Sequence, residues 1–347
     1  MSEESQDFSS QISQSTQSTQ LTQSTQSTEI NAEHSQAIES TQASQTESNH
    51  VPSDLLKITS WNLASLNSAW EKGLRYYIKA AQPDIFCVQE TKLHDKSEHP
   101  VSYYKLPGYH AYFSHAEKKG YSGTAIYTKI QPISVKISDG ISDKNGRCIT
   151  MEFSNFYLLN TYVINLGQDC QRKHEKLEVF NPEIEKHIQT LSKKKPVIWT
   201  GDLNVAHMPI DIWTTEGHES IAGYTNEERE WFDNFIKNNE YVDVFRELYP
   251  TKQQFSFFNY RGNAKGKNQG WRIDYFMMPK SMIKEGLIVD CTIENGDLSD
   301  HEPITLLLNR SMILSDADKP VEMTTCEILG KKTKSLLNFF AAAPKKK

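Results

Sequence analysis

The sequence predicts an α/β fold, with one layered domain over residues 54–310 and a disordered polar tail on each side of it. Short apolar runs alternate with amphipathic stretches along the domain, a pattern typical of interleaved strands and helices. Many of these runs are apolar at nearly every position, which favours strands covered on both faces. Residues 1–53 are mostly Ser, Thr and Gln, and a tract of that composition cannot bury enough surface to fold.

The elements are expected in alternation along the domain. Amphipathic stretches predict helices over 70–82, 172–193 and 225–239. Thr225 is the expected N-cap of the third helix, because acidic residues follow it in the first turn. The expected strands are LKITSWN (56–62), DIFCVQE (84–90), TAIYT (124–128), RCITMEF (147–153), FYLLNTYV (156–163), PVIWTGD (196–202), RIDYFMM (272–278) and HEPITLLL (301–308).

Charge is unevenly distributed along the chain. The net charge is −6, but residues 1–50 hold seven acidic and no basic residues, while residues 319–347 hold seven Lys against two Glu. The domain is therefore mildly acidic, which argues weakly against nucleic-acid binding unless carboxylates hold a metal ion. The sequence contains no run of about 18 apolar residues, so no membrane span is expected. The N-terminal residues lack the basic and apolar regions of a secretion signal, so secretion is not expected. The scattered cysteines predict free thiols in a reducing compartment: Cys87, Cys148, Cys170, Cys291 and Cys326.

Polar side chains stand at or near the ends of strands that are expected to be central. Ligands gather at strand ends in open α/β sheets, and a buried carboxylate is costly unless it is paired or bound to a cation. Each residue alone has an ordinary alternative as a turn residue, a cap or a structural histidine, but their joint occurrence favours a site. The residues are Asn62, Glu90, Asp202, Asn204, Asp274, Asp300 and His301.

This set of side chains suits the hydrolysis of a phosphodiester. Glu90 with a second oxygen ligand is typical of a Mg²⁺ site. Asp202 and Asn204 can hold or deprotonate a water molecule, and a carboxylate beside His301 would orient its imidazole. Attack of water on phosphorus needs this combination of a cation, a base and hydrogen-bond donors.

The motifs resemble those of the exonuclease III family of apurinic/apyrimidinic endonucleases. SWN, QETK, GYSG, GDLNVAH, AGYT-x-x-ER, GWRIDYF and SDHEPI follow in family order across residues 55–309. SWN and QETK also occur in the wider superfamily, whereas GDLNVAH, GWRIDYF and SDH are more specific. The resemblance implies a four-layered α/β sandwich, in which two packed mixed β-sheets are flanked by helices.

The resemblance also implies a role for each matching residue. Glu90 is the principal metal ligand, with Asn62, Asp300, Asp202 and Asn204 in the metal-site set. Asp202 also activates the water, Asn204 meets the scissile phosphate, and His301, oriented by Asp274, contacts the phosphate. The other implied contacts are Tyr162 and Asn165 to the phosphate, Phe257, Trp271 and Ile273 to the flipped-out abasic sugar, and Arg147, Lys92, Gly120, Tyr121, Ser122 and Gly123 to the DNA backbone.

Four positions depart from the family pattern. Ala64 replaces an Asp or Asn of the metal site, so weaker metal affinity is expected. Ile164 replaces a proline, and Gln168 stands where some animal relatives insert an arginine into DNA. Thr59 stands in place of the cysteine of a mammalian-type redox function, which is therefore not expected.

Both tails carry motifs of their own. Residues 333–340 resemble a PIP box, in which Leu336, Phe339 and Phe340 would dock on the DNA sliding clamp (PCNA), although Thr333 replaces the usual Gln. An ordinary amphipathic turn is the alternative. The Lys clusters at 331–334 and 345–347 predict nuclear import, or arise by chance. Ser or Thr precedes Gln ten times in residues 1–50, which resembles sites of DNA-damage checkpoint kinases or reflects simple repeat expansion.

The resemblance thus implies a nuclear, monomeric enzyme of DNA base excision repair that uses Mg²⁺ or Mn²⁺. It would hydrolyse the phosphodiester 5′ to an abasic site, leaving a 3′-hydroxyl and a 5′-deoxyribose phosphate, with 3′-phosphodiesterase or 3′–5′ exonuclease activity besides. One alternative is a phosphodiesterase of the same fold that acts on RNA, an inositol phosphate or a lipid headgroup. The other alternative is a catalytically weak adaptor bound to the clamp, and Ala64 is the only residue that supports it.

Overall fold

The computed structural model describes residues 54–94 and 106–321. The Ser/Thr-Gln tract, the PIP-box-like residues Leu336, Phe339 and Phe340 and the Lys clusters at 331–334 and 345–347 lie outside the described residues. The boundaries that the sequence predicts for the three segments therefore stay predictions. Among the described residues, no helix is both long and apolar enough to cross a membrane.

The first sheet has six strands in the order β11-β12-β1-β2-β4-β3. Its central strands β1 (Leu55–Asn62) and β2 (Ile85–Gln89) run parallel, with Asn62 opposite Gln89. The remaining pairs are antiparallel, so the sheet is mixed. Its other strands are β3 (His110–Ser114), β4 (Thr124–Thr128), β11 (Ile288–Ile293) and β12 (Ile304–Asn309).

The second sheet also has six strands, in the order β5-β6-β7-β8-β10-β9. Here β7 (Tyr157–Tyr162) and β8 (Val197–Asp202) are parallel, while β10 (Asp274–Pro279) runs antiparallel to β8. Its other strands are β5 (Ser134–Ile137), β6 (Cys148–Glu152) and β9 (Tyr241–Asp243).

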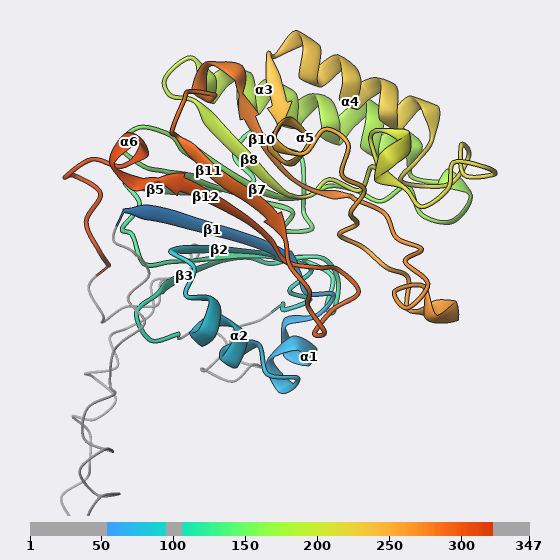
Figure 1. Cartoon of the computed structure of the whole chain (residues 1–347), viewed down its shortest axis with the longest axis horizontal. Coiled ribbons are helices and arrows are strands. Elements are labelled where there is room, and N and C mark those ends of the chain that lie inside the picture. Colours follow the sequence, from blue (N-terminus) through green and yellow to red (C-terminus); the bar gives the residue numbers. More distant parts are fainter. Residues whose placement is uncertain (1–53, 95–105, 322–347) are drawn as a thin grey trace, which may run out of the picture. The chain divides into compact units, whose positions relative to one another are not determined.

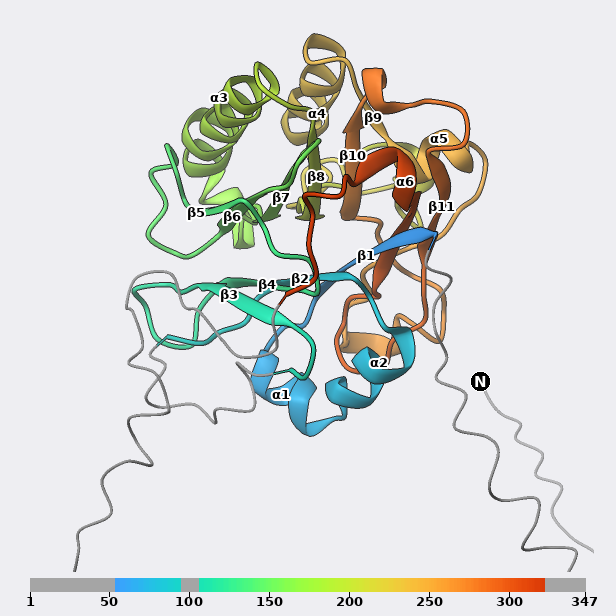
Figure 2. The same ribbon diagram turned by 90° about the vertical axis from the view of Figure 1, so that its left-hand side faces the viewer.

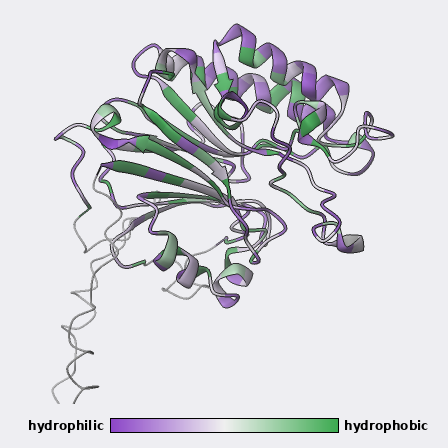
Figure 3. Ribbon diagram, viewed as in Figure 1, coloured by the Kyte–Doolittle hydropathy of each residue, from purple (hydrophilic) through white to green (hydrophobic). Residues whose placement is uncertain are grey.

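The two sheets pack face to face and helices cover their outer faces (Figures 1 and 2). Helices α1 (Leu66–Glu71) and α2 (Leu74–Ala81) pack on the first sheet, and α3 (Asn181–Ser192) and α4 (Asn226–Asn238) on the second. Short helices α5 (Val244–Leu248) and α6 (Arg310–Ile313) follow strands β9 and β12. The central strands are among the most apolar parts of the ribbon (Figure 3), since both of their faces are covered. The predicted four-layered α/β sandwich is confirmed.

The structure corrects some boundaries. The helix expected over 70–82 is two helices, because Gly73 between them has a φ of 109°, outside the helical region. The helix expected over 172–193 contains a π-helical turn, η4 (Glu175–Phe180), before α3. The sequence did not predict strands β3, β5, β9 and β11. The Thr225 N-cap is confirmed: its side chain accepts a hydrogen bond from the backbone N–H of Glu228.

Candidate active site

The polar strand ends meet at one edge of the two sheets. Because β1 is parallel to β2, and β7 to β8, their carboxyl ends lie together. Strand β10 is antiparallel to β8, so its first residue, Asp274, lies opposite the last residue of β8, Asp202. The same reversal brings His301, just before β12, to the end of β1. The topology thus collects residues that are far apart in the chain.

Asn62 joins two carboxylates from different sheets. Its side-chain nitrogen donates to Glu90 Oε1 at 3.1 Å and to Asp202 Oδ2 at 2.9 Å, and its oxygen accepts from the backbone N–H of Ala64. Asn62 thus aligns Glu90 with Asp202. Its predicted place in the metal-site set stays a prediction.

Asp202 and His301 lie close enough for one oxygen atom beside them to form a hydrogen bond with both. His301 Nε2 lies 3.9 Å from Asp202 Oδ2, and His301 Nδ1 lies 2.8 Å from Asp274 Oδ2. Ser256 donates its hydroxyl to the same Asp274 oxygen at 2.7 Å, a contact that the sequence did not reveal. All three charged side chains are buried.

Burial and the neighbouring charges shift the protonation of this cluster. Burial, with Asp274 beside it, raises the pKa of Asp202 to about 7. Burial lowers the pKa of His301, but the carboxylates of Asp274 and Asp202 outweigh burial and raise it to about 10. His301 is therefore an imidazolium at neutral pH, whereas Asp202 readily accepts a proton.

Asn204 is held in a tight turn after β8. Its backbone N–H donates to Asp202 Oδ1 at 2.9 Å, and its side-chain oxygen accepts from Asn165 Nδ2 at 2.8 Å. The turn also needs Gly201, since a Cβ there would stand 1.9 Å from the carbonyl oxygen of Thr161. The predicted partners Asp202, Asn204 and Asn165 thus form one hydrogen-bonded chain.

Glu90 is the residue that the family resemblance implies as the principal metal ligand. Its carboxylate already pairs with the ammonium of Lys92, with Nζ 3.0 Å from Oε2. Burial opposes the charge of Glu90, but Lys92, Asn62 and His301 together outweigh burial and lower the pKa of Glu90. Asp202, Asp274 and His301 also lie close enough to share an ion.

A cavity of about 300 Å³ opens beside these groups. Its apolar wall contains the predicted pocket residues Phe257, Trp271 and Ile273, with Trp271 packed edge-on against Tyr224. Its polar wall holds most of the predicted chemical groups. The polar lining comprises Glu90, Tyr162, Asn165, Asp202, Asn204, Asn259, Asp300 and His301.

Tyr162 and Asp300 belong to this polar wall and differ in their surroundings. Burial, then the charges of Glu90 and Asp202, raise the pKa of Tyr162 well above its ordinary value, so its hydroxyl stays a donor. Asp300 is half-buried and accepts from the Ser299 hydroxyl at 3.3 Å. Their roles stay predictions.

The residues predicted to touch the DNA backbone are mostly not free to do so here. Arg147 is 1% exposed, and its guanidinium donates to the hydroxyl of Tyr121 and the backbone oxygen of Tyr162. Ser122 and Gly123 are buried too, and Lys92 is paired with Glu90. Of this predicted set, Gly120 is exposed and Tyr121 half-exposed. Arg147 therefore supports two tyrosines, because its guanidinium is buried against them.

Comparisons with known proteins point in one direction. Residues 59–301 match the Endonuclease/Exonuclease/phosphatase family. The chain is 36% identical over 264 residues to a DNA-(apurinic or apyrimidinic site) endonuclease of Dictyostelium discoideum, covering 75% of this chain and 72% of that protein. It is 36% identical over 259 residues to an exodeoxyribonuclease of Bacillus subtilis, covering 73% and 100%. The solved AP endonuclease LMAP from Leishmania major is similar with a TM-score of 0.67 and 28% identity, over 74% of this chain and 89% of that one.

Proposed function

This chain belongs to the endonuclease/exonuclease/phosphatase family, and from that membership we propose that it is a DNA-repair hydrolase that cuts the backbone 5′ to an abasic site. One observation carries the proposal: a basic carboxylate, Asp202, and an imidazolium, His301, face each other 3.9 Å apart beside a cavity with one apolar wall. Exonuclease or 3′-phosphodiesterase activity at the same site is proposed with it, since one relative is an exodeoxyribonuclease.

Asp202 is the general base of the proposed reaction. A water held at Asp202 loses its proton to the carboxylate while its oxygen bonds to phosphorus. The bond from phosphorus to the 3′-oxygen of the preceding nucleotide breaks, and that oxygen takes up a proton from solvent to become the 3′-hydroxyl. Asp202 then releases its proton to solvent and is ready for the next turnover. Asn62 and the backbone N–H of Asn204 fix the two oxygens of Asp202, so the base is oriented before substrate binds.

His301 and a bound divalent ion would share the charge of the phosphate. The imidazolium donates from Nε2 to a non-bridging oxygen, and Asp274 keeps it charged and correctly turned. Glu90, with Asp300 on the same cavity, would hold a divalent ion, for which we propose Mg²⁺ with Mn²⁺ as a substitute. When bound there, such an ion would neutralise phosphate charge and so lower the barrier to attack.

The apolar wall accounts for the choice of an abasic sugar. Phe257, Trp271 and Ile273 offer ring and aliphatic surface and no charge, which suits a flipped-out deoxyribose without its base. A phosphorylated inositol ring would need cations around it, and the described cavity lining contains no Lys or Arg. This observation favours the abasic site over the alternative phosphoesters.

A duplex oligonucleotide that carries one tetrahydrofuran abasic analogue tests the proposal. We expect a single cut on the 5′ side of the analogue that EDTA abolishes and Mg²⁺ restores. The matched control is the same duplex with thymidine at that position. Equal cutting of both duplexes, or efficient turnover of an inositol phosphate or of RNA instead, would contradict the proposed substrate.

The tail motifs lead to further proposals about partners. We propose that the lysine clusters direct the monomeric enzyme to the nucleus, and that checkpoint kinases modify the Ser/Thr-Gln tract. We also propose that residues 333–340 bind the DNA sliding clamp (PCNA). Changing Phe339 and Phe340 to Ala should abolish clamp pulldown and leave incision of naked DNA unchanged. Clamp binding that survives the double change would refute the clamp proposal.

A further inference from the structure

We propose that the buried ion pair between Lys176 and Glu228 is a positioning device that holds Asn204 and the wall of the cavity in their working geometry. The inference rests on the proposed function, because Asn204 and that cavity are the parts it serves. Neither Lys176 nor Glu228 lines the cavity. Both act through backbone groups of residues that do.

Lys176 reaches the turn that carries the base. Its ammonium lies 2.5 Å from Glu228 Oε1 and donates to the backbone oxygen of Asn204 at 2.8 Å. Asn204 has a φ of 50°, a left-handed conformation that Asn adopts more readily than other residues with a side chain. The bond from Lys176 fixes the peptide that follows Asn204. Because the Asn204 N–H lies on the other side of the same Cα, this bond helps to hold that N–H at Asp202.

Glu228 reaches the opposite wall. Its second oxygen, Oε2, accepts from the backbone N–H of Gly223 at 2.8 Å and from the N–H and hydroxyl of Thr225. Gly223 lines the cavity, and its carbonyl accepts from the N–H of Ala206 at 2.7 Å. The ion pair thus ties together two loops, residues 202–206 and 221–225, that both face the substrate.

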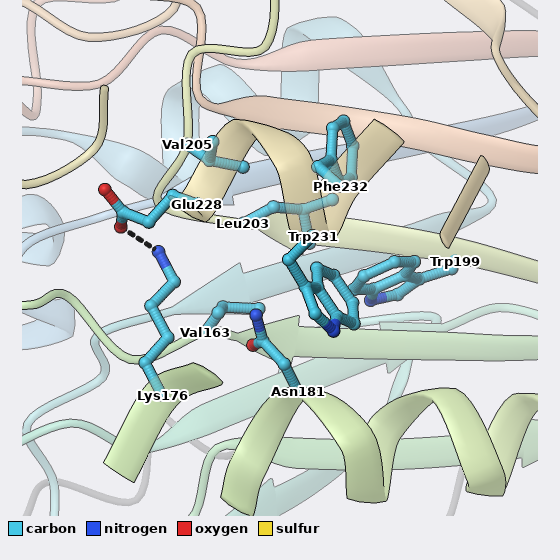
Figure 4. Close-up of a pocket in the computed structure, with 9 residues that line it drawn as sticks. All are labelled: Val163, Lys176, Asn181, Trp199, Leu203, Val205, Glu228, Trp231 and Phe232. Atoms are coloured by element: carbon cyan, nitrogen blue, oxygen red, sulfur yellow. Dashed lines mark hydrogen bonds and ion pairs between the residues drawn. The ribbon is translucent and has the colours of Figure 1, made fainter. Parts of the chain in front are cut away.

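Stability alone does not account for the pair. The side chains of Lys176 and Glu228 are 1% and 0% exposed, and the surrounding side chains are largely apolar (Figure 4). Desolvation cancels most of the attraction in such a pair, and apolar replacements are often equally stable. Figure 4 shows Lys176 rising from one segment toward Glu228 at the start of α4, with Val163, Leu203 and Val205 beside them. What apolar residues could not supply is the set of hydrogen bonds to the two loops.

The local backbone gives a second indication. Lys176 lies in the π-helical turn η4. Such turns are rare in proteins overall, but where they occur they are often at functional sites. The exposed pair Lys173–Glu227 bridges the same two segments, with Nζ 2.5 Å from Oε1 and the side chains 47% and 51% exposed. The Lys173 ammonium donates to Glu227 instead of to either loop. This exposed pair therefore offers a matched control.

The test compares the variant K176M/E228Q with the control K173M/E227Q. The double change avoids a lone buried charge, and the amide introduced at position 228 keeps an oxygen for Gly223 and Thr225. We expect kcat on the abasic duplex to fall roughly 10- to 100-fold, the loss typical of a misplacement of about 1 Å, with KM nearly unchanged. The control should match the wild type. K176R, which keeps a charged donor, should recover part of the rate lost in K176M.

Amide hydrogen exchange supplies a readout independent of catalysis. In K176M/E228Q the amides of Asn204 and Ala206 should exchange faster, while those of β8 and β10 keep their protection. An unchanged kcat, a loss seen equally in the control, or a rise in KM alone would overturn the inference. So would unchanged exchange at Asn204 and Ala206. If the wild type itself fails to nick the abasic duplex, the proposed function falls, but the exchange result still decides whether the pair holds the loops.

Discussion

The two ends of strand β8 are equally buried, but one end carries an apolar side chain and the other a charged one. On β8, Ile198, Thr200 and Asp202 point to the same side, because side chains alternate along a strand. Their exposed fractions are 0%, 0% and 1%. Ile198 belongs to the core between the sheets, whereas Asp202 ends the same face as a carboxylate. Burial alone therefore does not explain the choice of residue at each position. A buried carboxylate is costly, so Asp202 marks the site.

The neighbouring strands repeat the change from apolar to polar. A middle layer of amides and hydroxyls separates core from site: Gln89 donates to Ser60 at 2.9 Å and to Asn160 at 2.7 Å. Asn160 in turn donates to the backbone oxygens of Val88 and Ala125. This layer ties strands of the two sheets together beneath Asn62 and Asp202. The candidate site therefore rests on a polar layer whose hydrogen bonds hold it in place.

Removing the polar end should abolish the chemistry and spare the fold. We expect Asp202→Ala or His301→Ala to lower kcat by several orders of magnitude, because in the proposed mechanism each removes a group that contacts the reacting atoms. The assay is single-turnover cleavage of the abasic duplex, with circular dichroism to confirm folding. Near-normal cleavage by either variant would show that its role has been misassigned.

Truncating Ile198 at the apolar end of β8 should lower stability and spare the activity. Ile198→Ala leaves a cavity between the sheets and should cost about 2–5 kcal/mol of unfolding free energy, measured by urea denaturation. At a temperature where the variant stays folded, kcat should remain within a few-fold of the wild type. A stable but inactive Ile198→Ala protein would mean that core and site are not separable along the strand.

The charged end should also make stability depend on pH. His301 has a raised pKa, so its contribution is complete below about pH 6.5 and is lost as pH rises through about 10. The raised pKa of Asp202 acts in the same direction, between about pH 4 and 7. In EDTA, the unfolding free energy should therefore fall between pH 7 and 10, and less steeply in Asp274→Asn. Parallel curves for the two proteins would contradict this account of His301.

The smallest expected effect concerns the strained backbone beside the site. Ala64 has a φ of 52°, a left-handed conformation that costs an ordinary residue about 1 kcal/mol. Asn adopts it more readily, so Ala64→Asn should stabilise the protein by up to about 1 kcal/mol in thermal denaturation. Ala80→Asn, on the exposed side of α2, should instead destabilise slightly. The same sign for both changes would refute the backbone explanation.

Prediction from the sequence succeeded for elements with a strong local signal. The eight expected strands and the layered architecture were found, since a run apolar at every position is typical of a strand covered on both faces. The missed strands β5 and β11 are largely half-exposed, and β9 has three residues, so their patterns are weak. The missed site residues Ser256, Lys176 and Glu228 act through hydrogen bonds to groups distant in the chain, which no local pattern shows.

The sequence by itself determined which residue types the protein would bring to its strand ends, because a carboxylate or imidazole beside an apolar run is visible without coordinates. Only the tertiary structure decided how they are used. The antiparallel pairing of β10 with β8 places Asp274 opposite Asp202, and the amide of Asn62 turns its nitrogen toward two carboxylates. Arg147, which the sequence assigned to DNA, is buried under two tyrosines. Protonation and direction depend on neighbours contributed by other strands, and those neighbours are fixed only when the two sheets close on each other.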